Sequence, residues 1–212
     1  MPIVLLAVYA VVGVVHEVAA LRFWNVLRAV TKCLLMPALL AYYCVAAHGP
    51  LVVAILAIAF SWLGDVILLG KDNINLFRLG MLAFLLSHVF YIVTLVGLTT
   101  RWHVPALIAS VVVALAAEIV LPRLVKPPKG MLIPILVYGA AICTMSIFAL
   151  QYALSSQTLA AWGLFVGSIV FIFSDAILAY FSFGKKPKHF NAITMLPYIV
   201  AQALIVVGLA CA

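Results

Sequence analysis

The acidic side chains are the groups in this sequence most able to do chemistry, and there are only five of them in 212 residues. Asp65 and Asp175 lie inside long apolar runs. An ionised group at the centre of a bilayer costs at least about 2.5–3.5 kcal/mol, so such residues usually face the interior of a helix bundle. Two carboxyl groups at similar depth can move protons, as acid–base catalysts and proton-coupled carriers do. This pair is the first candidate for a functional site.

The other three acids have simpler interpretations. Asp72 falls in a connection between apolar runs. Glu17 and Glu118 lie near the ends of their runs, where we expect ion pairs with Arg22 and Arg123.

Further polar residues occur at similar depths on other apolar runs. With a rise of about 1.5 Å per residue, Asp65 lies about 8 Å and Asp175 and His88 about 13 Å from the same membrane surface. Groups at these depths can line one cavity that opens toward that surface. Each also has a structural interpretation, because serine and glutamine often bridge helices in membranes and lysine can extend to the interface or balance Asp65. The candidates beside the aspartates are Lys32, Ser61, His88, Ser174, Tyr198 and Gln202.

The composition predicts the kind of element that must position these residues. Hydrophobic residues make up 68% of the chain and charged residues 8%, whereas soluble domains carry about 25% charged residues. So few charges cannot cover a surface that faces water. A soluble enzyme, a disordered protein and a nucleic-acid-binding protein are therefore excluded. The net charge is +7, but the basic residues are distributed between the apolar runs and form no patch in the sequence.

The apolar runs predict an all-α membrane protein with eight transmembrane helices in a single integral domain, residues 1–212. Each run approaches the roughly 20 apolar residues that a membrane span requires. The predicted spans are residues 2–21, 29–47, 51–70, 79–98, 104–122, 131–154, 158–184 and 191–211.

The basic residues predict the orientation. Eleven of the twelve lysines and arginines flank the first, third, fifth and seventh connections, and only Arg101 lies in an even-numbered one. Because positive residues favour the cytoplasmic side, the odd connections should be cytoplasmic and both termini outside.

A short internal similarity suggests a parallel 4+4 repeat. Residues 65–68 and 175–178 both read Asp-x-Ile-Leu, 110 residues or four predicted helices apart. Both segments run from outside to inside in the predicted topology.

The sequence offers little support for a metal or another cofactor. None of the four cysteines has the C-x-x-C spacing of metal and redox sites. Of the five histidines only His88 lies deep in a span, and there is no H-x-x-x-H pair. We therefore expect neither a metal nor a cofactor.

Several segments together resemble the YhhN-like membrane proteins, the transmembrane lysoplasmalogenases. Residues 61–68 (SWLGDVIL) resemble the S-x-x-G-D-x-x-L motif of that family, and residues 174–179 (SDAILA) resemble its S-D-x-x-L-A motif. Residues 77–91 resemble its F-x-x-G-L-x-x-F-x-x-x-H-x-x-Y stretch, and Pro197, Tyr198 and Gln202 resemble its last helix. Lys32 and Pro37 resemble its lysine–proline helix with a wider spacing than the adjacent pair we would expect.

The resemblance implies hydrolysis of the vinyl-ether bond of lysoplasmalogen, with Asp65 and Asp175 as the catalytic acid–base pair. It implies that the polar residues around them bind the substrate, and that Arg78 or Lys32 meets its phosphate. The expected partners are a lysophospholipid and the membrane lipid, without nucleic acid or an obligate protein partner. The expected location is a bacterial inner membrane.

Three other functions fit parts of the pattern. A 4+4 repeat with acids inside the membrane also fits a proton-coupled transporter of a small molecule or lipid, although 212 residues are few for a carrier. One histidine and two aspartates are the ligand types of a metal-dependent hydrolase. An Asp pair that only fixes helix packing would fit a structural protein.

Overall fold

The structure is a computed structural model that describes the backbone of residues 1–212 and every side chain except those of Leu121 and Pro122. Over this backbone the chain forms eight long α-helices and no strand, and the short 3-10 turn Leu68–Gly70 extends the third helix. The helices are α1 (Pro2–Leu21), α2 (Asn25–Ala46), α3 (Val52–Ile67), α4 (Ile74–Leu98), α5 (Val104–Val125), α6 (Leu132–Ser156), α7 (Leu159–Phe183) and α8 (Phe190–Ala210).

All eight helices, with α3 taken together with its 3-10 turn, are long and apolar enough to cross a membrane. Helices suit this environment because they satisfy their own backbone hydrogen bonds where water is absent. Large apolar side chains such as Val11, Val112 and Ile133 are exposed on the outside of the bundle, as expected of a surface that faces lipid. The prediction of an all-helical, multi-pass integral membrane protein is confirmed.

Two helices extend several residues further than their predicted spans at the basic end. α2 begins at Asn25 rather than at residue 29, and α4 begins at Ile74 rather than at residue 79. The Asn73 side chain caps α4 by accepting a hydrogen bond from the backbone N–H of Asn75. The prediction ended spans where arginine or lysine appeared, but these long side chains reach the interface from within a helix.

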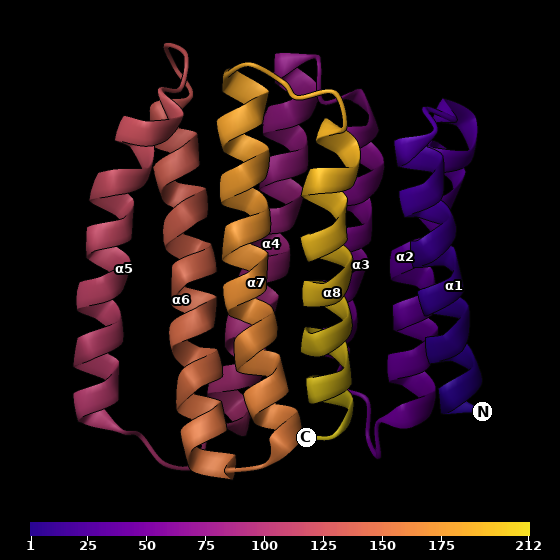
Figure 1. Ribbon diagram of the computed structural model, residues 1–212. Coiled ribbons are helices and arrows are strands. Elements are labelled where there is room, and N and C mark those ends of the chain that lie inside the picture. The colour runs from indigo at the N-terminus through magenta and orange to yellow at the C-terminus, as the bar shows by residue number, and fades with distance from the viewer.

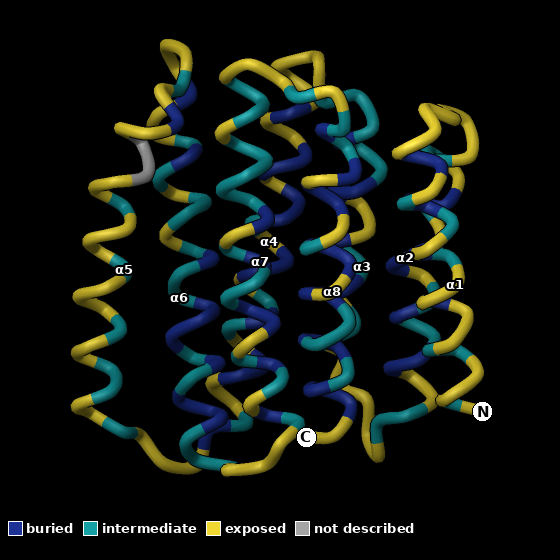
Figure 2. Tube along the Cα trace, viewed as in Figure 1, coloured by how far each residue is buried: buried dark blue, intermediate teal, exposed yellow. Residues whose placement is uncertain are grey.

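The helices pack around one cluster of buried apolar side chains that draws on every helix except α5 among the described residues. In Figure 1, α7 and α8 form the front of the bundle and α3 and α4 the back, with α1 and α2 at one side and α5 and α6 at the other. α5 packs on α6 and α7 only at its inner face and is exposed along most of its length (Figure 2). α5 is therefore peripheral, and the other helices share the apolar core.

A glycine allows the close approach of α7 and α8. A Cβ atom at Gly208 would lie 2.5 Å from the Cβ of Leu164 and 2.8 Å from the carbonyl oxygen of Ala160. Small residues allow such contacts in membranes, where the association of helices depends on van der Waals packing.

Both chain termini lie at the same end of the bundle, opposite the four odd-numbered connections (Figure 1). This arrangement follows from an even number of spans. The basic residues thus gather at one end of the molecule. The location of the termini outside the cell and the 4+4 repeat both stay predictions.

We expect a reporter fused at Ala212 to lie outside the cytoplasm, because the basic connections should be retained inside. Alkaline phosphatase, which is active only after export, should be active at Ala212. The matched control is the same reporter inserted in the connection at Lys129, where it should be inactive. A fluorescent cytoplasmic reporter that folds at Ala212 would contradict this topology.

Candidate active site

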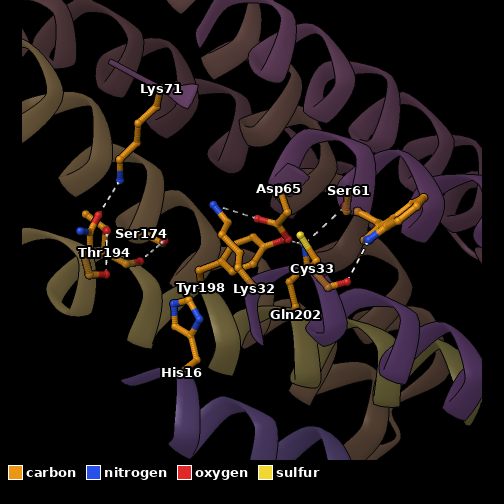
Figure 3. Close-up of polar contacts among 12 residues, drawn as sticks. His16, Lys32, Cys33, Ser61, Asp65, Lys71, Ser174, Thr194, Tyr198 and Gln202 are labelled. Atoms are coloured by element: carbon orange, nitrogen blue, oxygen red, sulfur yellow. Dashed lines mark hydrogen bonds and ion pairs between the residues drawn. The ribbon is translucent and has the colours of Figure 1, made fainter. Parts of the chain in front are cut away.

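Asp65 lies in the last turn of α3, where a lysine and a tyrosine from two other helices contact it. It is 2% exposed, and Lys32 Nζ on α2 lies 3.4 Å from its Oδ1. The Tyr198 hydroxyl on α8 donates a hydrogen bond of 2.5 Å to its Oδ2 (Figure 3). A buried charge requires a partner of opposite charge and hydrogen bonds, and Asp65 has both. Lys32 therefore balances Asp65 rather than extending to the membrane surface.

A second layer of polar groups positions Tyr198. Gln202 Nε2, one turn further along α8, lies 3.4 Å from both the Tyr198 hydroxyl and Ser61 Oγ. Ser61 Oγ lies 2.7 Å from Ser87 Oγ on α4, and Ser87 donates to the carbonyl oxygen of Ala57. These bonds connect α3, α4 and α8 beside Asp65. Linked polar groups of this kind give a buried site one defined arrangement.

Gly64 brings α4 close to this part of α3. A Cβ atom at position 64 would lie 2.5 Å from the Phe84 ring, so any other residue would force this ring to move. The Phe84 ring in turn packs edge-on against Tyr198, with 6.0 Å between the ring centres. Gly64 thus allows a close contact between α3 and α4, and Asp65 follows directly after this contact.

Asp175 lies on α7 and is bound by a tyrosine from α6. Its Oδ2 accepts a hydrogen bond from the Tyr138 hydroxyl. Tyr138 packs edge-on against His88, with ring centres 5.6 Å apart, and His88 packs against Phe171 at 5.0 Å. Among the described side chains no lysine or arginine lies within ion-pair distance of Asp175. The two aspartates therefore have different surroundings, one with a cation and one without.

Both aspartates line the same cavity, whose volume is about 160 Å³. A single water needs about 10–15 Å³ measured in this way, so the cavity has room for water beside part of a substrate. Its walls are mostly apolar and come from α2 to α8. Lys71 and Phe183 line it near the end of the bundle that carries the basic connections. The cavity therefore extends toward the basic end of the bundle.

The structure brings five of the nine predicted site residues to the cavity wall: Lys32, Asp65, Ser174, Asp175 and Tyr198. Ser174 donates a hydrogen bond to the Thr194 carbonyl oxygen and so also connects α7 to α8.

The remaining four predicted residues lie outside the wall. Ser61 and Gln202 form the layer behind Tyr198. His88 donates through Nδ1 to the Phe84 carbonyl oxygen at 2.5 Å and is covered by the aromatic rings. Arg78 extends away toward the α5–α6 connection, where its Nε lies 3.2 Å from Met131 Sδ. The position of a residue along a helix does not fix the direction in which its side chain points.

Four polar residues of the cavity wall were not among the predicted site residues: Lys71, Glu118, Tyr138 and Thr194. Tyr138 lies in the middle of an apolar run, where a tyrosine is an ordinary packing residue. Lys71 was counted as a topology signal in a connection. Its position directly after the helix that carries Asp65 was the available signal that it belongs near the site.

The two predicted ion pairs of the glutamates are wrong. Neither Glu17 with Arg22 nor Glu118 with Arg123 comes within 4.0 Å in the described part of the chain. Glu118 instead lines the cavity beside Gly139, where an added Cβ would overlap its carboxylate. Residues five apart on a helix are separated by about 500° of rotation at 3.6 residues per turn, so their side chains do not share a face.

The described residues contain no group of three histidine, cysteine, aspartate or glutamate side chains placed to hold a metal ion. All four cysteines are free thiols.

The fold and the site together define a multi-pass helical membrane protein with two aspartates, one buried and one half-buried, on one mostly apolar cavity. The model of the YhhN family matches residues 27–209, and the chain belongs to that family. A mouse protein, lysoplasmalogenase TMEM86B, is similar to it, with 28% identity over 152 residues. The aligned part covers 72% of this chain and 61% of the mouse protein, so the chain spans less than two thirds of that relative. No solved structure matches the chain.

Proposed function

We propose that the protein hydrolyses the vinyl-ether bond of lysoplasmalogen. The products are a fatty aldehyde and a glycerophospho-ethanolamine or glycerophospho-choline. The observation that carries the proposal is the pair of aspartates, Asp65 buried and Asp175 half-buried, on the wall of one mostly apolar cavity. The similarity to a mouse lysoplasmalogenase supports the same chemistry, and the location in a bacterial inner membrane remains part of the proposal.

The reaction needs one acid and one water. A proton added to the β-carbon of the vinyl ether converts the double bond into an oxocarbenium ion. Water then adds to the α-carbon and loses a proton to a carboxylate, which gives a hemiacetal. The hemiacetal breaks its bond to the glycerol oxygen, which takes up a proton, and releases the aldehyde. A protonated carboxyl group and an ionised carboxylate in one site supply both proton transfers.

The surroundings of the two aspartates suggest their roles. Lys32 lies 3.4 Å from Asp65 and favours its carboxylate form, which orients the water and stabilises the cationic intermediate. Asp175 has a tyrosine hydroxyl as its partner and no cation within 4.0 Å among the described side chains. We therefore assign the proton donor to Asp175.

The membrane location fits a single-chain lipid. Its tail can lie against apolar walls such as Phe84, Ile142 and Ile172, while its polar end faces the basic end of the bundle. Exclusion of bulk water strengthens the electrostatic effect of the carboxylates on the developing positive charge. A second acyl chain would have to fit the same cavity, so the two-chain plasmalogen should react poorly.

The test is aldehyde release by the purified protein from lysoplasmalogen and from its saturated alkyl-ether analogue. We expect aldehyde from the vinyl ether only, because the alkyl ether has no carbon that can be protonated to give an oxocarbenium ion. The analogue has the same tail and phosphate and should inhibit competitively, with an affinity near that of the substrate.

Two outcomes would contradict the proposal. Cleavage of the alkyl ether, or no competition from it, would exclude the protonation mechanism. If no aldehyde forms and proteoliposomes carry the ether analogue across the membrane, the protein is a transporter.

A further inference from the structure

A polar recess adjoins the catalytic cavity at the basic end of the bundle. It has a volume of about 140 Å³ and shares Lys71, Phe77 and Phe183 with the cavity wall. Ser182 and Lys186 complete its polar lining together with Asp72. We call this feature the lysine recess. A ligand can therefore occupy the recess and the cavity at the same time.

Lys71 brings a positive charge to the recess that no described carboxylate balances within 4.0 Å. Its Nζ donates to Asn191 Oδ1 at 3.0 Å and lies 4.2 Å from the centre of the Phe190 ring. Burial and the nearby cations Lys32, Arg28 and Lys186 lower the pKa of Lys71 to about 7. A partly buried ammonium group among other cations is stabilised by an anion beside it.

Lys186 supplies a second cation that is free to change partner. Its Nζ lies 5.7 Å from the centre of the same Phe190 ring and 2.6 Å from Asp72 Oδ1. Both side chains of that ion pair are exposed, and exposed pairs contribute little to stability. An anion in the recess can therefore draw Lys186 away from Asp72.

The Ser182 hydroxyl is a further unused group in the recess. Its oxygen is buried and has no hydrogen-bond partner among the described residues. Buried polar atoms normally have partners, and a hydroxyl can donate to a ligand oxygen. Two ammonium groups and a free hydroxyl are the donors that a phosphate group takes.

We propose that the lysine recess binds the phosphodiester of a lysophospholipid, through Lys71 and Lys186 with a hydrogen bond from Ser182. The inference rests on the proposed function and extends it to the recognition of the headgroup. It replaces the expectation that Arg78 or Lys32 meets the phosphate, because Arg78 lies at the α5–α6 connection and Lys32 is bound to Asp65.

The spacing along α7 fits such a ligand. Ser182 follows Asp175 by seven residues, two turns of one helix face, which is about 10 Å at 1.5 Å per residue. About seven bonds separate the phosphorus from the β-carbon of the vinyl ether, which is about 8 Å at roughly 1.2 Å per bond in an extended chain. A phosphate group that accepts a hydrogen bond from Ser182 thus places the reactive carbon of the lipid near Asp175.

The experiment measures direct binding of two non-cleavable ligands with the same tail, an alkyl-ether lysophosphatidylethanolamine and the alkylglycerol that lacks the phosphate. The full chain in detergent should bind the first about ten- to one-hundred-fold more tightly, as expected for charge-assisted hydrogen bonds. Lys71→Gln and Lys186→Gln should each reduce this ratio, and the double variant should bring it close to one. Lys188→Gln is the matched control in the same connection and should keep the ratio, and Lys71→Arg should keep most of it.

The other outcomes of the binding experiment separate the phosphate site from the proposed hydrolysis. If the wild-type protein binds both ligands equally, or if the lysine variants keep the full ratio, the inference is wrong even when aldehyde release is observed. If the ratio depends on the lysines but no aldehyde forms, the phosphate site stands and the proposed hydrolysis fails. Displacement by free glycerophosphoethanolamine as strong as that by the lipid would show a site for free phosphodiesters and overturn the lipid assignment. If Lys71→Gln does not fold, as judged by size-exclusion chromatography, Lys186→Gln and Ser182→Ala decide.

Discussion

Replacement of Asp175 by asparagine is expected to abolish aldehyde release while the bundle stays folded. The amide has nearly the same shape, and its oxygen can still accept the hydrogen bond from Tyr138. It cannot give a proton to the vinyl ether, and general acid catalysis contributes about 10²–10⁴-fold to a rate. We expect kcat to fall by at least that factor, measured as free aldehyde, with a melting temperature close to that of the wild-type protein.

Tyr138→Phe is the control for this variant. It removes the hydrogen bond to Asp175 and keeps the carboxyl group, so a smaller loss of kcat is expected. An Asp175→Asn protein with near-wild-type aldehyde release would show that Asp175 is not the proton donor. A variant that fails to assemble would leave Tyr138→Phe as the test, because loss of orientation alone should still slow the reaction.

The fold could be predicted from the sequence because the membrane imposes a strong and simple constraint. Each span needs a long apolar run, and the basic residues alternate between connections, so the number and order of helices followed directly. The ends of α2 and α4 could not be predicted as well. Arginine in a sequence usually marks a connection between spans, but Arg28 and Arg78 both belong to helices whose first turns extend beyond the apolar region.

The aspartates of the site could be predicted because ionisable residues inside apolar spans are rare and have few alternative explanations. Their partners were harder to predict. Asp175 is bound by Tyr138 from α6, a contact between helices that depends on the packing of aromatic rings rather than on any spacing in the chain. Glu118 was assigned to Arg123 by proximity in sequence, yet helix rotation turns it toward the cavity.

In the proposed reaction, the contact between Lys32 and Asp65 has both a structural and a catalytic role. The pair connects α2 to α3 at a buried position. Each residue can be buried there because the other balances its charge. Burial of two charges gives little net stability when they are paired, but removal of one partner leaves the other charge uncompensated. A single substitution at either residue therefore affects the folding of the bundle as well as the reaction, which distinguishes Asp65 from Asp175.

We accordingly expect Lys32→Met to destabilise the protein by about 3–5 kcal/mol, the usual cost of breaking a buried ion pair from one side. Asp65→Asn should be destabilised for the same reason. The double variant has no buried charge at this position and should be more stable than either single variant, although all three should release no aldehyde. Unfolding in detergent, measured as a double-mutant cycle, checks this expectation. Destabilisations that simply add in the double variant would show that the two residues are not coupled, and an active Lys32→Met protein would show that Asp65 works without its cation.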